Sequence, residues 1–218
     1  MKLFSRAILI LSVLSLTFAS AQQKPAASGS GSGDRAAQAK SQASAKTQST
    51  IREALSAAPP AIAKTATVKD WQGNVLKQGD GAYTCFPTPP AMKGIGPMCL
   101  DKAWLDWREA WMNKKQDFKA DGVGIAYMLQ GDTGVSNTDP YATQKTADND
   151  WVVSGPHTMV LVPDTSALDA IPTDHHNGGP FVMWKGTPYV HIMVPMGNKA
   201  SSAGGGAVAM KPASAKSQ

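Results

Sequence analysis

Two short segments repeat one arrangement of histidine and methionine. His157-Thr158-Met159 and His191-Ile192-Met193 each place an imidazole two residues before a thioether. Because residues two apart point to the same side of a β-strand, each segment would present both groups on one surface. Imidazole with thioether is a soft ligand set, which suits copper better than calcium or magnesium. If the two strands are neighbours, the sequence predicts a metal site made of His157, Met159, His191 and Met193.

Two further histidines and a competing interpretation bear on this site. His175 and His176 lie in a polar loop and could add a ligand to the same ion. Methionine is also a common filler of hydrophobic cores, and a strand histidine is often a hydrogen-bonded structural residue. The four residues are therefore open to a metal-binding and to a purely structural interpretation. Copper is the one cofactor that the pattern favours.

Enzymatic motifs are absent from the sequence of the expected folded region. It holds no P-loop, no complete dinucleotide-binding fingerprint, no H-E-x-x-H and no nucleophile elbow. A histidine such as His157 or His191 could act as an acid or base with Asp164 or Asp174, but no spacing requires it. The catalytic residues of an enzyme would thus be unknown, and a binding protein is favoured over an enzyme.

The N-terminus predicts export. Residues 1–21 combine basic Lys2 and Arg6, an apolar run and small residues at 19–21, which is typical of a cleavable signal peptide. No later segment approaches the roughly 20 apolar residues that a membrane-spanning helix needs. We therefore expect a periplasmic or secreted protein with no transmembrane segment in its mature form.

Composition divides the rest of the chain. Residues 22–50 consist only of Gln, Lys, Pro, Ala, Ser, Gly, Asp, Arg and Thr, with nothing larger than Ala to bury, so we expect a disordered tether there. We expect residues 199–218 to form a disordered tail. The remaining 51–198 predict one globular domain. The whole chain has a formal charge of +5, but 51–198 holds 12 Lys and Arg against 15 Asp and Glu. A slightly acidic domain disfavours nucleic acid as a partner, while the basic tails could contact the cell envelope weakly.

The cysteines and the hydrophobic pattern predict the fold. Cys85 and Cys99, in an exported chain and without a C-x-x-C motif, predict a structural disulfide. A helix is expected from Asp101 to about Lys115, with Trp104, Trp107 and Trp111 on one face. Short strands with short connections surround it. We expect an α+β fold, with a mainly antiparallel sheet packed by this one Trp-rich amphipathic helix.

Several segments resemble an uncharacterised family of exported bacterial proteins. They are residues 57–60 and 67–71, Pro97-Met98-Cys99-Leu100-Asp101, Ser136-Asn137-Thr138-Asp139-Pro140-Tyr141, Gly155-Pro156-His157 and residues 183–189. The resemblance spans nearly all of the expected folded part. It implies export and the extent of the domain, but no activity, cofactor or catalytic residue.

Three functions remain open on the sequence. The first is an exported binding protein whose ligand is a soft metal, or a small molecule resting on the His-Met face with Trp184 and Tyr189. The second is a secreted hydrolase-type enzyme that uses a histidine and a carboxylate. The third is a structural protein of the cell envelope whose tails make the contacts.

Overall fold

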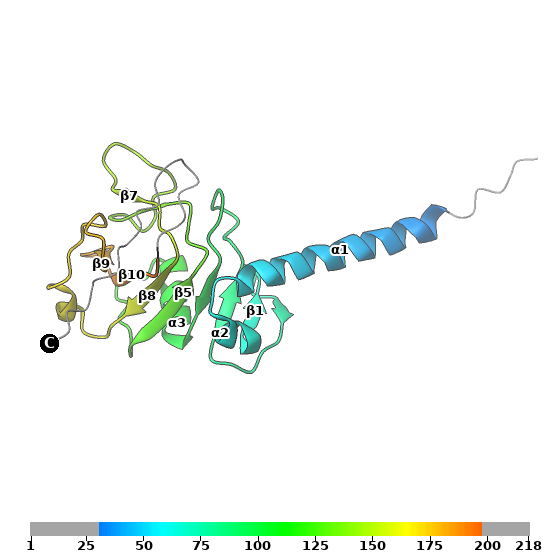
Figure 1. Cartoon of the computed structure of the whole chain (residues 1–218), viewed down its shortest axis with the longest axis horizontal. Helices are drawn as coiled ribbons and strands as arrows, with labels where there is room; N and C mark the ends of the chain where they lie inside the picture. Colours follow the sequence, from blue (N-terminus) through cyan, green and yellow to red (C-terminus); the bar gives the residue numbers. More distant parts are fainter. Residues whose placement is uncertain (1–30, 198–218) are drawn as a thin grey trace, which may run out of the picture. The chain divides into compact units, whose positions relative to one another are not determined.

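The computed structural model describes residues 31–197 and contains an eight-stranded sheet (Figure 1). The order across the sheet is β2-β1-β3-β4-β5-β8-β10-β9, and every pair is antiparallel except β1 with β3. A separate hairpin pairs β6 (Val135–Ser136) with β7 (Trp151–Val152). The strands of the main sheet are β1 (Thr67–Lys69), β2 (Val75–Lys77), β3 (Thr84–Phe86), β4 (Met98–Leu100), β5 (Gly124–Met128), β8 (His157–Leu161), β9 (Phe181–Met183) and β10 (His191–Pro195). The expected α+β fold with a mainly antiparallel sheet is confirmed.

One face of the sheet packs against helix α3 (Lys102–Met112), as the tryptophan spacing predicted. Asp101 caps this helix, because its carboxylate accepts a hydrogen bond from the backbone N–H of Trp104. The helix buries Trp104, Trp107 and Ala110. The core on this side also contains the methionines and histidines of β5, β8 and β10, so α3 helps to enclose the candidate metal ligands.

On the opposite face of the sheet, α1 and α2 cover the part made by β1, β3 and β4. The last turns of α1 (Gly31–Leu55) bring Ile51 and Ala54 into a cluster with Val68 of β1 and the two cysteines. The short helix α2 (Pro60–Thr65), which begins with a proline at its first turn, packs its Ile62 against the same cluster. The predicted Cys85–Cys99 disulfide is confirmed at the centre of this cluster and joins directly opposed residues of β3 and β4.

Helix α1 differs from the predicted tether. It begins at Gly31, whereas the composition of 22–50 predicted disorder, and its residues from Arg35 to Thr47 are almost all exposed. An exposed helix needs no buried face, because its backbone hydrogen bonds are internal and Ala, Gln, Lys and Arg are strong helix formers. The part of α1 up to Lys40 and the described chain from Ser41 onward are separate units. The predicted signal peptide, residues 22–30 and the predicted tail lie outside the described residues.

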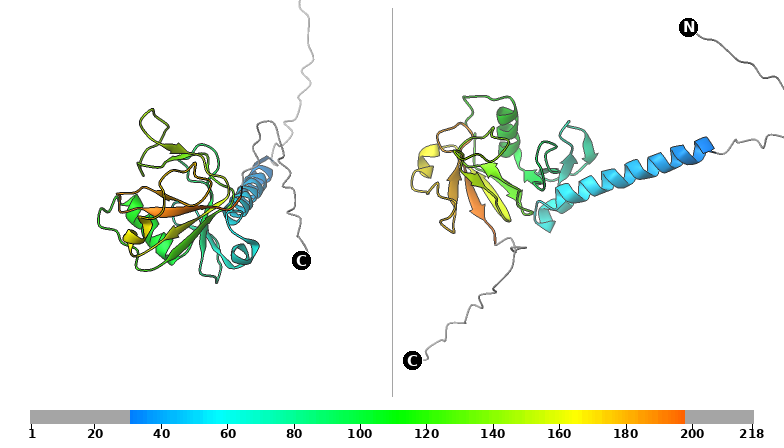
Figure 2. Two further views of the ribbon diagram at one scale, coloured as in Figure 1. Left: turned by 60° about the vertical axis from the view of Figure 1, so that its left-hand side comes forward. Right: turned by 90° about the horizontal axis from the view of Figure 1, so that it is seen from above.

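The remaining elements are short and connect the strands (Figure 2). A 3-10 helix, η1 (Thr165–Leu168), follows β8, and Asp164 caps it. Among residues 31–197, no helix has the length and apolar character that crossing a membrane requires.

Candidate functional site

The two His-Met segments lie on neighbouring strands, as the metal hypothesis requires. Strand β8 pairs antiparallel with β10, and Met159 lies directly opposite Met193. Opposed residues of an antiparallel pair have Cβ atoms about 5 Å apart, so the two thioethers lie side by side. His157, Met159, His191 and Met193 are all buried, at 8% exposure or less, on the face that α3 covers.

The register separates the two histidines. His157 lies opposite Pro195, four residues beyond His191 in β10. Four residues of strand span about 13 Å, so the imidazoles stand at opposite ends of the methionine pair. The four-ligand site therefore stays a prediction, and each histidine has to be considered with its own neighbours.

Strand β5 brings a further methionine to His157. Met128 lies directly opposite His157, and Met159 lies opposite Ala126 of the same strand. The alternation of Gly124, Ala126 and Met128 places Met128 on the α3 side, where it is 5% exposed. His157 is thus flanked by Met128 across one strand pair and by Met159 two residues along its own strand. Met98 of β4 packs against the same cluster.

The ring of His157 has a defined tautomer. Its Nδ1 lies 2.8 Å from the carbonyl oxygen of Gly155. A carbonyl only accepts hydrogen bonds, so Nδ1 carries a proton, and in the neutral form of the ring the lone pair is then on Nε2. Metal-binding histidines commonly donate their second N–H to a backbone carbonyl in this way. The ring of His157 therefore has the tautomer of a ligand that binds through Nε2.

A methionine nearer the surface adjoins this cluster. Met92, which is partly exposed, lies in the loop between β3 and β4. A Cβ at Gly96 would meet the sulfur of Met92 and would lie 3.7 Å from the terminal methyl of Met128. The absence of a side chain at Gly96 thus lets Met92 and Met128 approach one another. The thioethers of Met92 and Met128 therefore connect a partly exposed position with the buried neighbour of His157.

His191 has a different environment. Three tryptophan rings meet it edge to face, with ring centroids 5.2 Å (Trp104), 5.8 Å (Trp107) and 5.1 Å (Trp184) from its own. Its Nδ1 lies 2.9 Å from the carbonyl oxygen of Tyr189. Burial lowers the pKa of His191 to about 4, so the ring is neutral at pH 7. This contact set is that of a structural core histidine.

Trp184 and Tyr189, considered as a surface for a small molecule, belong to the same core. They are 8% and 1% exposed. Trp107 stacks on Trp184 at 5.6 Å and receives the edge of Tyr189 at 6.0 Å. Their rings are therefore engaged in packing.

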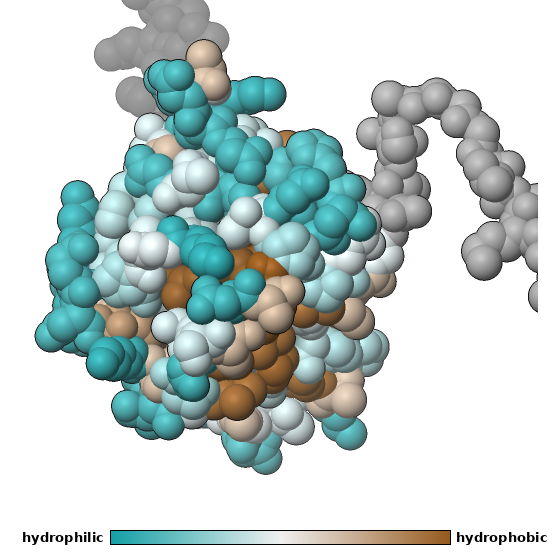
Figure 3. Space-filling model, turned by 90° about the vertical axis from the view of Figure 1, so that its left-hand side faces the viewer, coloured by the Kyte–Doolittle hydropathy of each residue, from teal (hydrophilic) through white to brown (hydrophobic). Residues whose placement is uncertain are grey.

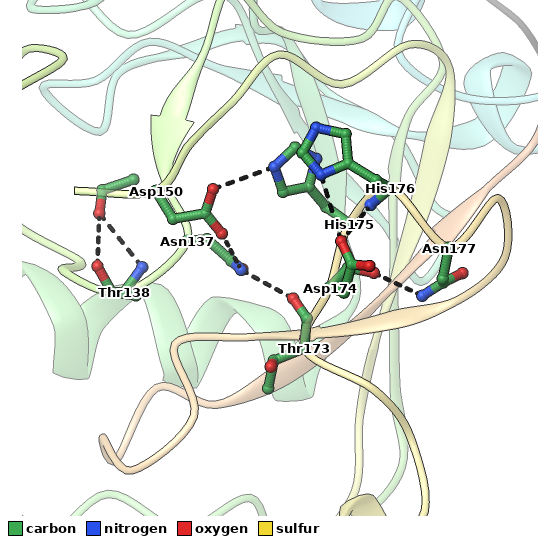
Figure 4. A network of polar contacts seen from close by, with 9 residues as sticks. Asn137, Thr138, Asp150, Thr173, Asp174, His175, His176 and Asn177 are labelled. Atoms are coloured by element: carbon green, nitrogen blue, oxygen red, sulfur yellow. Dashed lines mark hydrogen bonds and ion pairs between the residues drawn. The ribbon is translucent and has the colours of Figure 1, made fainter. Parts of the chain in front are cut away.

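His175 and His176 lie away from the strands, in a polar loop cluster (Figure 4). The Nε2 of His175 is 3.1 Å from Asp150, whose other oxygen accepts a hydrogen bond from the side-chain amide of Asn137. His176 lies 3.2 Å from Asp174, and the two imidazole centroids are 3.7 Å apart. The Asp174 carboxylate accepts a hydrogen bond from the backbone N–H of His176 and a second from its ring, and these hydrogen bonds lower the pKa of Asp174. The cluster borders a hollow of 390 Å³, whose lining includes Thr138, Thr173 and Lys185.

A second hollow has a volume of 420 Å³ and is lined by both apolar and polar residues. It is lined by Phe118, Leu161, Val162, Leu168 and Val190, with Lys119 and Lys185 among its charged residues. On the side of the molecule where β9 lies in Figure 1, Figure 3 shows hydrophobic residues gathered at the centre and hydrophilic residues around them. This hollow contains no histidine or methionine and is separate from the candidate metal ligands.

No family model, curated protein or solved structure matches this chain. The resemblance to an exported bacterial family therefore stays a prediction. Among residues 31–197, no group of three or more His, Cys, Asp or Glu side chains is placed to hold a metal ion. The cluster around His157 is not such a group, because its other candidate ligands are the thioethers of methionines.

The sequence pattern did not identify two candidate ligands, Met128 and Met92. The alternation Gly124-Ile125-Ala126-Tyr127-Met128 could have placed Met128 on the buried face of its strand. No sequence signal shows that this strand lies beside His157, because strand order depends on the whole fold. Met92 lies in a loop without periodicity, and only its contact across Gly96 identifies it.

Proposed function

We propose that this protein is an exported copper-binding protein, which holds Cu(I) with His157 and the thioethers of Met128, Met159 and Met193. The observation that supports it most is the register of β5, β8 and β10, which places Met128 opposite His157 and Met193 opposite Met159. One imidazole and three thioethers on a single buried face form a soft ligand set. His191 has a structural role in this proposal.

The chemistry of the ligands favours the reduced ion. Thioethers are neutral, soft donors that select Cu(I) over hard oxygen-seeking ions such as calcium and magnesium. The hydrogen bond from Nδ1 of His157 to the Gly155 carbonyl would hold the ring in orientation and keep Nε2 basic. Methionine side chains have three rotatable bonds, so their sulfurs can converge on an ion without moving the strands.

The partly exposed methionines offer a route to the buried ligands. Met92 and Met98 are each partly exposed, and both adjoin Met128 or its cluster. Copper would bind first at these thioethers and then pass to the His157 ligands. The disulfide is in keeping with export, because such bonds persist in oxidising compartments and are rare in the cytosol.

The test is an anaerobic competition titration of the full-length, disulfide-bonded chain with a chromogenic Cu(I) chelator. We expect Met128→Leu and His157→Gln each to weaken Cu(I) binding by at least roughly tenfold, since even a lost outer partner of a metal ligand costs 10–100-fold. Leucine keeps the volume of methionine and removes only the sulfur. Calcium and magnesium should not compete.

Met183→Leu is the matched control. Met183 is equally buried and lies opposite His191 instead of His157. Its replacement should leave the affinity for Cu(I) unchanged. Unchanged affinity in Met128→Leu, or equal losses in Met128→Leu and Met183→Leu, would contradict the proposed ligand set.

A second candidate function is favoured by the His175–Asp150 pair. A histidine in hydrogen-bond reach of a carboxylate that lines a hollow of 390 Å³ could serve as an acid or base in a hydrolytic reaction. This enzyme hypothesis predicts ester or amide hydrolysis that His175→Ala abolishes. The same substitution should leave Cu(I) binding unchanged, which separates the two functions.

A further inference from the structure

Arg108 lies over an aromatic corner made by two other elements. Its guanidinium carbon is 4.6 Å from the centroid of Trp71 and 4.5 Å from that of Phe86. The two rings are 5.3 Å apart and inclined by 38°. The indole N–H of Trp71 donates to the carbonyl oxygen of Pro87 at 2.8 Å, which fixes one wall of the corner. The corner therefore exists independently of any ligand and holds one face of the guanidinium.

The charge of Arg108 has no counter-ion among residues 31–197. Neither an ion pair nor a hydrogen bond within the described part of the chain involves its guanidinium, and its Nε is buried without a hydrogen-bond partner there. Burial alone lowers the pKa of this group. The side chain is only partly buried, so the guanidinium is held by the rings while its charge stays uncompensated.

The residue type at this position is informative. Arg108 is the only arginine after Arg52, whereas ten lysines lie between residues 53 and 197. An apolar side chain would fill the aromatic corner without the cost of removing a charge from water. A lysine would keep the charge but would lose the planar stacking and the paired N–H donors. Arginine is the residue that combines stacking on rings with two-point binding of an oxyanion.

We propose that Arg108 binds an oxyanion, a carboxylate or a phosphate group, through the guanidinium N–H groups that the Trp71–Phe86 corner leaves uncovered. The rings fix the plane of the guanidinium, and the anion supplies the missing counter-charge. This site is separate from the copper ligands, and it does not depend on copper being bound.

The test follows the side-chain ¹⁵N signals of Arg108 in the full-length chain during titration with inorganic phosphate and, separately, with acetate, at constant ionic strength. We expect a saturable shift of the Arg108 signals with at least one of the two anions, and the pair of titrations shows which oxyanion is preferred. Signals that do not move with either anion would overturn the proposal.

Substitutions distinguish binding from packing. In the Arg108→Met variant, unfolding without added anion should need as much denaturant as in the wild type, or more, and the stabilisation by the preferred anion should disappear. Arg108→Lys should bind that anion at least roughly tenfold more weakly, because the paired donors are lost. The matched control is Lys114→Met, because Lys114 also lies over an aromatic ring, that of Tyr141, at 5.1 Å. This variant should leave the stabilisation by the anion unchanged. Loss of stability in Arg108→Met together with no anion effect in the wild type would show a purely structural role.

Discussion

At the residue scale, the two strand histidines share a local hydrogen bond but differ in their surroundings. Each directs Nδ1 to the carbonyl oxygen of the residue two positions before it. His157 has Met128 opposite and Met159 on its own strand, whereas His191 stands among three tryptophan rings. The repeated His-x-Met pattern therefore produces one candidate ligand and one core residue, because the neighbouring strands supply different partners.

The burial of His191 predicts a loss of stability in acid. Its folded-state pKa of about 4 lies below the ordinary value of 6.5, so the folded protein resists protonation. The resulting stability is fully present above about pH 6.5 and is lost as the pH falls toward 4. Denaturant unfolding at pH 7 and pH 4.5 should therefore show a loss about 2–3 kcal/mol larger in the wild type than in His191→Phe.

The comparison with His191→Phe isolates this histidine. Asp70, Asp164 and Asp174 also have lowered pKa values, so their protonation in acid also destabilises the fold. These three residues are present in both proteins, so their contributions cancel in the difference between wild type and His191→Phe. An equal acid sensitivity of the two proteins would show that His191 is protonated in the folded state without penalty.

At the scale of the elements, Asp101 connects the helix to the sheet. One carboxylate oxygen accepts from the N–H of Trp104 at 3.0 Å, and the other accepts from the N–H of Ile125 at 2.5 Å. Asp101→Ala should lower the free energy of unfolding by about 1–2 kcal/mol for the cap, with a further loss for the unpaired Ile125 N–H. Asp101→Asn retains the capping oxygen, so its free energy of unfolding in a denaturant titration should lie between those of the wild type and Asp101→Ala. Identical stability of all three proteins would contradict this role.

The elements also show where sequence reasoning succeeds. The tryptophan spacing predicted α3, because this pattern is set by local helix geometry. Met112 lies at the last turn of α3 and is 50% exposed, so the helix does not bury it. The register of β8 against β10 and the place of β5 beside β8 could not be predicted, since they depend on contacts between distant segments. Those two features decide which methionines meet His157.

At the scale of the whole molecule, the disulfide joins two fully buried cysteines at the centre of the cluster under α1 and α2. It closes a segment with a sequence separation of 14. By the chain-entropy estimate, a loop of this size contributes about 3 kcal/mol. The Cys85→Ala/Cys99→Ala protein should lose about this amount in denaturant unfolding. Reductant should destabilise the wild type and leave the double variant unchanged, and a wild type that is insensitive to complete reduction would contradict the estimate.

The central claim concerns the atoms that surround copper, and X-ray absorption at the copper edge measures them most directly. The full-length chain loaded with one equivalent of Cu(I) should show one nitrogen neighbour and three sulfur neighbours, with one sulfur fewer in Met128→Leu and no change in Met183→Leu. A copper environment of nitrogen and oxygen alone, or a sulfur count that Met128→Leu leaves unchanged, would contradict the account.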